Sequence, residues 1–193
     1  MKNNMTDPLE LQRRNMIEYQ QIDNQGNELF KKNGKSKMPD YLNNLFMEEY
    51  KEGQEAKQES NEEKLADASG DMLICIAGGI IQHKIPIECM KNLNSKPFKK
   101  DNISVIQPVE KVIARLNEAT APFQKAVLFE NLWFGVVNEA IDSGFDIEGI
   151  YNAIAENNLA RILRDENGDP ITDENEKIMR KDMHPDLKPF VMS

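Results

Sequence analysis

The chain has few of the residues on which many enzyme and metal sites depend, with two cysteines and two histidines among 193 residues. Cys75 and Cys89 form no Cys-x-x-Cys pair, so neither a disulfide framework nor a zinc site is indicated. His83 falls at a predicted helix end and His184 in a polar tail, and we interpret both as structural or surface residues. No Gly-x-Ser-x-Gly motif is present, which removes the usual signature of a serine hydrolase.

Long apolar runs and excess positive charge are also missing. The longest apolar run, residues 72–81, is far short of the roughly 20 residues that a membrane span needs, and the first residues contain no signal-peptide core. The net charge is −9 with 30% charged residues, whereas proteins that bind nucleic acids or anionic membranes favour Lys and Arg. We therefore expect an intracellular protein that binds neither, and whose acidity suits binding of an anionic substrate through a metal ion.

Strand signals are scarce, and apolar residues recur at helical spacing. The pattern predicts an all-α bundle of five to six helices with a turn-rich C-terminal tail. The helices are expected at residues 8–23, 39–58, 61–83, 107–119, 122–143 and 146–163. Asp40 is expected to cap the second helix, a short helical turn and a polar linker (94–104) follow the third, and a β-hairpin is one option around Asn167-Gly168.

The length and the 39% hydrophobic content predict a single helical domain with a core of its own. Within it we expect a half that carries the acidic motifs (1–96), a second helical half (97–164) and a tail (165–193). The apolar helices of the two halves are followed by similar segments, which either duplication or convergent amphipathicity explains equally well. Asn131 stands where Asp71 stands in the first half, so a second copy of an acidic site would be degenerate.

Two short acidic clusters fall on the second and third predicted helices. At about 100° per residue, Glu49 shares a face with apolar residues such as Leu45, and Glu52 lies one turn further along. Asp71 opens the run 72–81, which is apolar on every side and so predicts a central buried helix. Burial of unpaired carboxylates costs several kcal/mol, so the clusters predict a divalent cation between the two helices.

Mg²⁺ prefers oxygen ligands and commonly binds through carboxylates, water and phosphate. The predicted metal-binding and catalytic residues are Glu49, Glu52, Asp67 and Asp71. Asp67 fits equally well a role near the N-terminus of its helix, and Glu63 is a further candidate ligand. Glu48, Glu55 and Glu59 fall toward the polar side and are interpreted as solvated surface, with Glu48 also a candidate helper base.

The acidic motifs resemble those of the MazG-like all-α nucleoside triphosphate pyrophosphohydrolases, in particular the phage-type branch related to phosphoribosyl-ATP pyrophosphohydrolase. Glu49-x-x-Glu52 matches the Glu-x-x-Glu motif of that family, and Asp67-x-x-x-Asp71 is similar to the acidic pair on its next helix. Ala68 stands where the family usually has Glu, three residues before Asp71. Asp67, one turn before Asp71, can reach the same face.

The C-terminal part extends the resemblance. The segment from Glu156 to Arg161 is similar to the family's Ser-Asn-Met-Ser-Lys segment, with Asn158 on the Asn and Arg161 on the Lys. The tail that follows places Lys177 and Pro185-Asp186 on recurring residues. The resemblance covers roughly residues 44–83 and 129–187. The paired halves are also similar to the dimeric all-α dUTPases, in which one half carries the acids.

The resemblance implies a Mg²⁺-dependent enzyme, with Mn²⁺ as a substitute, that converts a nucleoside triphosphate to the monophosphate and pyrophosphate. It implies that Asn158, Arg161 and Lys177 contact the nucleotide, and that the protein acts in the cytoplasm of a bacterium or of a phage-infected host. A homodimer or tetramer is expected from the family and from the surplus of apolar helix surface. Two alternatives are open: a dUTPase- or dCTPase-type pyrophosphatase of a phage nucleotide pathway, or a non-catalytic helical interaction module.

Overall fold

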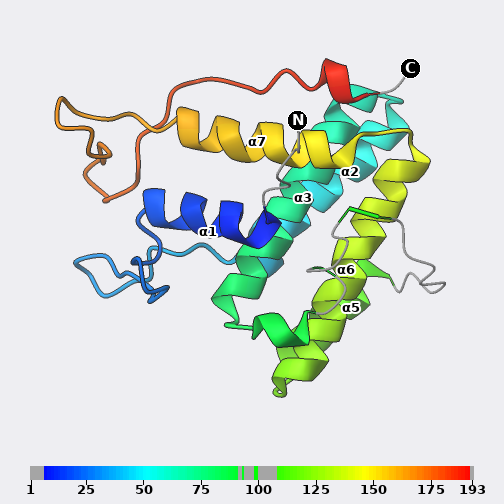
Figure 1. Ribbon diagram of the computed structural model, residues 1–193, viewed down its shortest axis with the longest axis horizontal. Helices are drawn as coiled ribbons and strands as arrows, with labels where there is room; N and C mark the ends of the chain where they lie inside the picture. The colour runs from blue at the N-terminus through cyan, green and yellow to red at the C-terminus, as the bar shows by residue number, and fades with distance from the viewer. Residues whose placement is uncertain (1–6, 91–92, 94–97, 100–107, 192–193) are drawn as a thin grey trace.

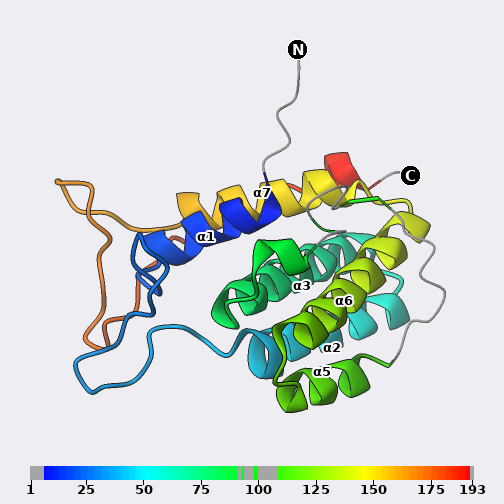
Figure 2. The ribbon, with the colours of Figure 1, turned by 60° about the horizontal axis from the view of Figure 1, so that its bottom comes forward.

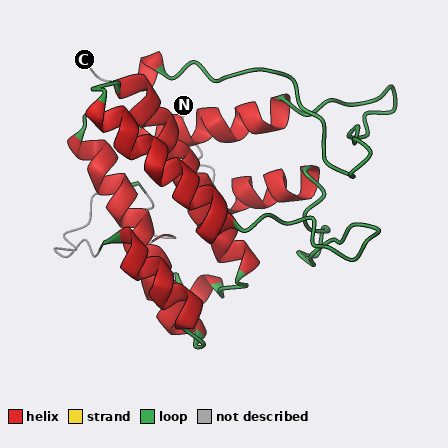
Figure 3. Cartoon of the chain, turned by 180° about the vertical axis from the view of Figure 1, so that it is seen from behind, coloured by secondary structure: helices red, strands yellow, loops and turns green. Residues whose placement is uncertain are grey.

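The computed structural model describes residues 7–90, 93, 98–99 and 108–191 (Figure 1). The elements in chain order are α1 (Pro8–Glu18), the π-helical turn η1 (Tyr41–Phe46), α2 (Met47–Gln58), α3 (Glu62–Gln82), the 3₁₀ turn η2 (Ile87–Cys89), α5 (Val109–Glu118), α6 (Pro122–Asp142), α7 (Ile147–Ala160) and the 3₁₀ turn η3 (Lys188–Phe190). Within the described ranges the chain forms isolated antiparallel bridges but no strand (Figure 3). The predicted all-α bundle is therefore confirmed.

The central element is α3. Every residue from Met72 to Ile80 is buried, as expected for a run that is apolar on all sides, and α1, η1, α2, α6 and α7 pack on this helix. Two glycines let its neighbours approach closely. A Cβ atom at Gly70 would lie 2.3 Å from Ile154 of α7, and one at Gly78 would lie 2.5 Å from the Tyr41 ring.

By length and composition alone, α3 is apolar enough to cross a membrane. A buried core helix has the same properties, and 72% of the most apolar window of α3 is buried within the structure. Figure 2 shows this helix in the interior, with α1 and α7 on one side and α2 and α6 on the other.

The first helix is shorter than predicted: it ends at Glu18 and not near Asp23. The Asp23 carboxylate accepts hydrogen bonds from the backbone N–H groups of Gln25 and Asn27, both at 2.8 Å. Such local bonds offer the backbone an alternative to the helix. Local hydrogen bonds of the same kind follow α7, which ends at Ala160, before its predicted end at Leu163.

The second predicted helix contains an irregularity that periodicity did not predict. Asp40 accepts from the Asn43 N–H at 2.9 Å, which confirms the cap. The first six residues, Tyr41–Phe46, then form a π-helical turn before α2 begins at Met47. Such turns are rare and are frequent at functional sites, and this one directly precedes the acidic residues.

The two halves share a helical frame at a constant spacing of 60 residues. The helices α3 and α6 each have 21 residues, and α2 ends at Gln58 where α5 ends at Glu118. Both long helices are followed by a residue with positive φ, Lys84 at 50° and Gly144 at 80°. The next N–H then bonds back to the helix, from Ile85 to Ile80 and from Phe145 to Ala140. This shared frame fits the duplication that the sequence suggests.

Candidate functional site

The predicted acids meet where α2 packs along α3. Burial, followed by the charges of Asp71, Glu52 and Asp67, raises the pKa of Glu49 to about 8. Burial and the charges of Asp67 and Glu52 raise the pKa of Asp71 to about 7. The structure therefore brings together the four predicted ligands from the two helices. The neighbouring carboxylates thus make ionisation of Glu49 and Asp71 less favourable.

The four acids differ in exposure. Glu49, Asp67 and Asp71 are partly buried, whereas Glu52 is exposed. The prediction that Glu52 continues the apolar face that Glu49 shares with Leu45 is therefore wrong. The reason is that the next residue, Gly53, faces α3: a Cβ atom at this position would lie 3.6 Å from the Ala68 side chain. Glu52 therefore lies at the rim of the cluster.

The remaining predicted acids lie outside the cluster's buried part. Glu48, Glu55, Glu59 and Glu63 are exposed, in agreement with the interpretation of the first three as solvated surface. Glu48 is still close enough to raise the pKa of Glu49, although its contribution is smaller than those of Asp71, Glu52 and Asp67.

Two basic groups face the cluster from the C-terminal part of the chain. The pKa of Asp67 is raised by burial, and the charges of His184 and Arg161 oppose this rise. Arg161 acts in the same sense on Asp71, while its Nε atom donates to the Lys181 carbonyl at 3.3 Å. The resemblance predicts a role for Arg161, whereas no sequence pattern indicates that His184 lies near the acids.

The chemistry of the cluster fits a hard divalent cation. Among the residues that the structure describes, Glu49, Glu52, Asp67 and Asp71 form no ion pair or hydrogen bond. Four carboxylate groups on two packed helices are a typical donor set for Mg²⁺ or Mn²⁺. In the same described ranges, no three Asp, Glu, His or Cys side chains are positioned to hold an ion as they stand, so binding would require them to draw closer.

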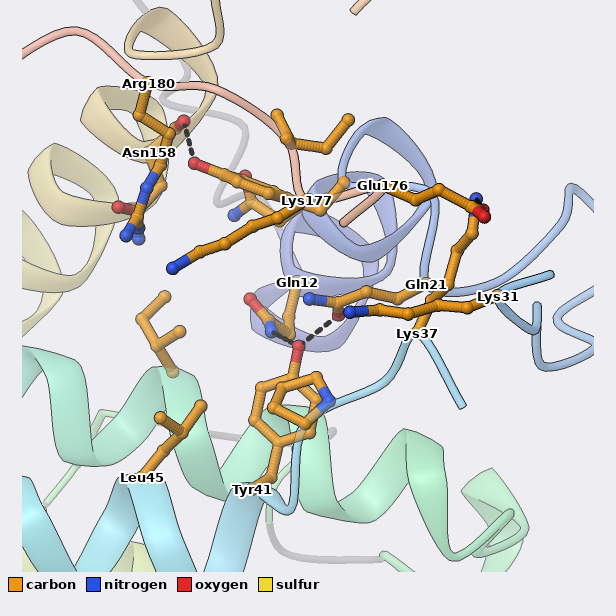
Figure 4. Close-up of a pocket in the computed structure, with 15 residues that line it drawn as sticks. Gln12, Gln21, Lys31, Lys37, Tyr41, Leu45, Asn158, Glu176, Lys177 and Arg180 are labelled. Carbon is orange, nitrogen blue, oxygen red and sulfur yellow. Dashed lines mark hydrogen bonds and ion pairs between the residues drawn. The ribbon is translucent and has the colours of Figure 1, made fainter. Parts of the chain in front are cut away.

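A cavity of about 420 Å³ lies between α1, η1, α3 and the C-terminal tail (Figure 4). On α1, Gln12 and Asn15 line it, although they are only 2% and 4% exposed. Within the described residues, the Gln12 side-chain oxygen and both polar side-chain atoms of Asn15 have no hydrogen-bond partner. Buried polar atoms are rarely left unpaired, so these amides point to a ligand or to bound water.

Tyr41 orients one of the two amides. The Gln12 Nε2 atom donates to the Tyr41 hydroxyl at 3.4 Å, and that hydroxyl donates to the Gln21 side-chain oxygen. The Gln12 carbonyl oxygen is thereby left as an acceptor for a ligand, while Asn15 offers both a donor and an acceptor. Together the two side chains match the mixed hydrogen-bonding edge of a nucleobase.

The cavity adjoins the acidic cluster. Its lining includes Leu45 and Ile74. Leu45 is four residues before Glu49, and Ile74 is three residues after Asp71, so each lies one helical turn from an acid. A ligand in the cavity can therefore extend along η1 and α3 to the carboxylates.

Cationic side chains surround the same cavity. Lys31, Lys37, Lys177 and Arg180 line it, and Glu176 is the one acidic residue among the described residues of the lining. Asn158 also lines it, and its carbonyl accepts from the Tyr19 hydroxyl at 2.8 Å. Of the nucleotide-binding residues implied by the resemblance, Asn158 and Lys177 thus border the cavity. Arg161 shares an adjacent groove with Lys177 and Arg180.

The corresponding positions of the second half carry no acids. At the constant spacing of 60, the four residues are Val109, Val112, Val127 and Asn131. Three of them, Val109, Val112 and Asn131, line a largely apolar groove of about 620 Å³ between the halves. The expectation of a degenerate second site agrees with this placement.

Comparisons with protein-family models, with curated proteins and with solved structures find no match to this chain.

Proposed function

We propose that the chain is a Mg²⁺-dependent nucleoside triphosphate pyrophosphohydrolase. The observation that carries the proposal is the proximity of three chemically distinct groups around α1, η1, α2 and α3. Unpaired amides (Gln12 and Asn15) lie at the cavity, basic side chains border it, and the acids of α2 and α3 begin one helical turn beyond Leu45 and Ile74. A nucleotide presents matching groups in the same order: a polar base, then phosphates. The sequence resemblance to MazG-like enzymes supports the same assignment.

The residues of this chain would divide the work as follows. Gln12 and Asn15 would hydrogen-bond the base, and Lys177, Arg180 and Arg161 would attract the polyphosphate toward the acids. Charge-assisted hydrogen bonds of this kind are stronger than neutral ones. Enclosure between α1 and the tail would limit the access of water to the base end.

The acids Glu49, Glu52, Asp67 and Asp71 would hold the metal. When bound, Mg²⁺ supplies charge neutralisation at phosphorus and a water of lowered pKa. Glu48, which is exposed beside Glu49, is the candidate for the base that accepts a proton from the attacking water.

A pyrophosphate-release assay tests the proposal. The standard ribo- and deoxyribonucleoside triphosphates would be compared with Mg²⁺, with Mn²⁺ and with EDTA. We expect metal-dependent release with one preferred base, and loss of release in Glu49→Gln and Asp71→Asn. Glu55→Gln, an exposed acid on the same helix, is the matched control and should remain active.

The alternatives make different predictions in the same assay. A strong preference for dUTP or dCTP would identify a dedicated pyrimidine pyrophosphatase. Turnover that persists in both acid variants would contradict the site assignment. Absence of turnover, together with absence of nucleotide binding by the folded protein, would favour the non-catalytic interaction module.

A further inference from the structure

Two segments outside the helical body repeat each other at a spacing of 142 residues. The first follows α1, which ends at Glu18, and the second follows α7, which ends at Ala160. Both project from the same side of the body (Figures 1 and 3). Each consists of two successive tight turns. We name them the first turn segment (residues 19–38) and the second turn segment (residues 161–180).

The hydrogen bonds within the two turns of each segment correspond. Asp23 donates its N–H to the Asn27 carbonyl as Asp165 does to that of Asp169, both at 2.9 Å. In the second turns, the Lys31 and Asp173 N–H groups bond to the carbonyls of Lys35 and Lys177, at 2.7 and 2.9 Å. The turns thus share one backbone frame, whereas the segments differ where they leave their helices: the Gln21 N–H bonds to the Met16 carbonyl, but the Leu163 N–H bonds to that of Met179.

The two turn segments differ at the left-handed position of the second turn. The left-handed position of the second turn is Gly34 in the first segment, with φ of 76°, but Glu176 in the second, with φ of 59°. Residues other than Gly, Asn and Asp seldom adopt this conformation. Strained backbone of this kind often accompanies a function, and here the side chain that it presents forms contacts between the two segments.

The Glu176 carboxylate joins the second segment to the first. It accepts from the Lys32 backbone N–H at 3.1 Å and lies 3.6 Å from the Lys37 ammonium. The side chains of Lys37 and Glu176 are 17% and 24% exposed. The hydrogen bond from the Lys32 N–H, followed by the charges of Lys32 and Lys37, lowers the pKa of Glu176.

This ion pair lies at one end of the cavity described above. Figure 4 shows Asn158 and Leu45 on one side of the cavity, and Lys31, Lys37 and Glu176 on the opposite side. Lys31 and Lys37 thus line a different end of the cavity from Leu45, the residue one turn before Glu49.

We propose that the Lys37 end of the cavity is an anion subsite, in which a phosphate group takes the place of the Glu176 carboxylate on Lys37 and the Lys32 N–H. A phosphate oxygen can accept from the same two donors as the carboxylate does. This exchange of carboxylate for phosphate involves hydrogen bonds and charge contacts, and no covalent bond is formed or broken. The subsite rests on the proposed function to the extent that the cavity holds a ligand, but its donors are independent of the acids.

Binding of inorganic pyrophosphate in EDTA, measured by isothermal titration calorimetry, tests the subsite. Glu176→Gly and Glu176→Gln remove the competing carboxylate, and the glycine variant is also compatible with the positive φ. We expect both to bind pyrophosphate about tenfold more tightly than the unchanged protein, as fits the loss of one competing charged contact. Adding Lys37→Gln should abolish the gain. Adding Lys35→Gln, an exposed lysine in the same turn, should not.

Two results would overturn the proposal: no gain in affinity in either Glu176 variant, or a gain that survives Lys37→Gln. Because EDTA removes the metal, both results are independent of hydrolysis. An additional Asp71→Asn change should leave the gain intact, so failure of the proposed function and failure of the subsite are distinguishable.

Two sources of the phosphate can be separated in the same experiment. A nucleoside 3′,5′-bisphosphate would be compared with the corresponding 5′-monophosphate in the Glu176→Gly variant. A preference for the bisphosphate that requires Lys37 assigns the subsite to a second phosphate on the nucleotide. Equal binding of both, with tighter pyrophosphate binding retained, assigns it to free phosphate groups such as the released product.

Discussion

The two halves of the bundle use one helical frame for two different surfaces. On α2 and α3, the frame presents Glu49, Glu52, Asp67 and Asp71. At the same positions of α5 and α6 it presents three valines and Asn131. Both helix pairs fold, so the carboxylates are not required for the frame. They act against it, because burial and mutual repulsion raise the pKa values of Glu49 and Asp71. A group that costs stability in one half and is replaced by an apolar residue in the other is a strong candidate for function.

The largest effect is expected where an acid is replaced by the residue of the other half. Asp71→Asn carries the Asn131 side chain into the first half. Loss of one metal ligand should reduce pyrophosphate release by about 10³-fold, since such electrostatic contacts supply several kcal/mol to the transition state. Release would be measured under saturating Mg²⁺. Activity within tenfold of the unchanged protein would contradict the assignment.

The reverse exchange tests the second half. Val112, at the position of Glu52, is 2% exposed. Val112→Glu would bury a carboxyl group without a partner and should lower the free energy of unfolding by about 3–4 kcal/mol. Glu52→Val, on the exposed rim, should change it by less than about 0.5 kcal/mol. Chemical denaturation of both variants provides the comparison, and equal effects would show that the halves are not distinguished by burial.

The pH dependence of stability offers a third contrast. The pKa values of Glu49 and Asp71 are about 8 and about 7 in the folded protein, above their ordinary values, so the folded state binds more protons than the unfolded state between about pH 4 and pH 8. The free energy of unfolding of the metal-free protein should therefore fall by several kcal/mol as the pH rises through this window.

Two controls accompany this pH series. The fall should be reduced in Asp71→Asn, which has no ionisable group at that position, and should be offset by added Mg²⁺, which binds the ionised form. A stability that rises over the same window would contradict the raised pKa values.

The smallest effect is expected at the amide end of the cavity. Asn15→Ala removes the two unpaired polar atoms of that side chain. It should raise the KM for the preferred nucleotide about tenfold with little change in kcat, because such a contact is made equally in the ground and transition states. Gln25→Ala, on the exposed first turn segment, serves as the control. A KM unchanged by Asn15→Ala would remove the amides from the proposed base site.

The acidic cluster could be predicted from sequence because helical periodicity alone places Glu49 and Asp71 on apolar faces. The amides could not, because Gln12 and Asn15 look like ordinary polar residues on an amphipathic helix. Only the packing of α3, α7 and the tail around α1 buries them. Their participation in a site is therefore a tertiary property.

The turn segments show a similar limit. The Asn167-Gly168 pair predicted a hairpin option, and the structure has an antiparallel bridge between Arg164 and Pro170 around it. The first predicted helix (8–23) extends into the matching segment after α1. Helical periodicity alone does not show that hydrogen bonds to the Asp23 side chain favour a turn there. The signal was present as an Asp followed three residues later by Gly, at both Asp23 and Asp165.

The most direct test of the acidic cluster is a Mn²⁺ titration of the protein near pH 8, followed by the electron paramagnetic resonance signal of free Mn²⁺. Glu49→Gln, Asp71→Asn and the control Glu55→Gln would be titrated in parallel. We predict saturable binding by the unchanged protein and by Glu55→Gln, and binding weakened by at least about tenfold in the other two variants. Absence of binding by the unchanged protein, or equal binding by all four, would contradict a metal site between α2 and α3.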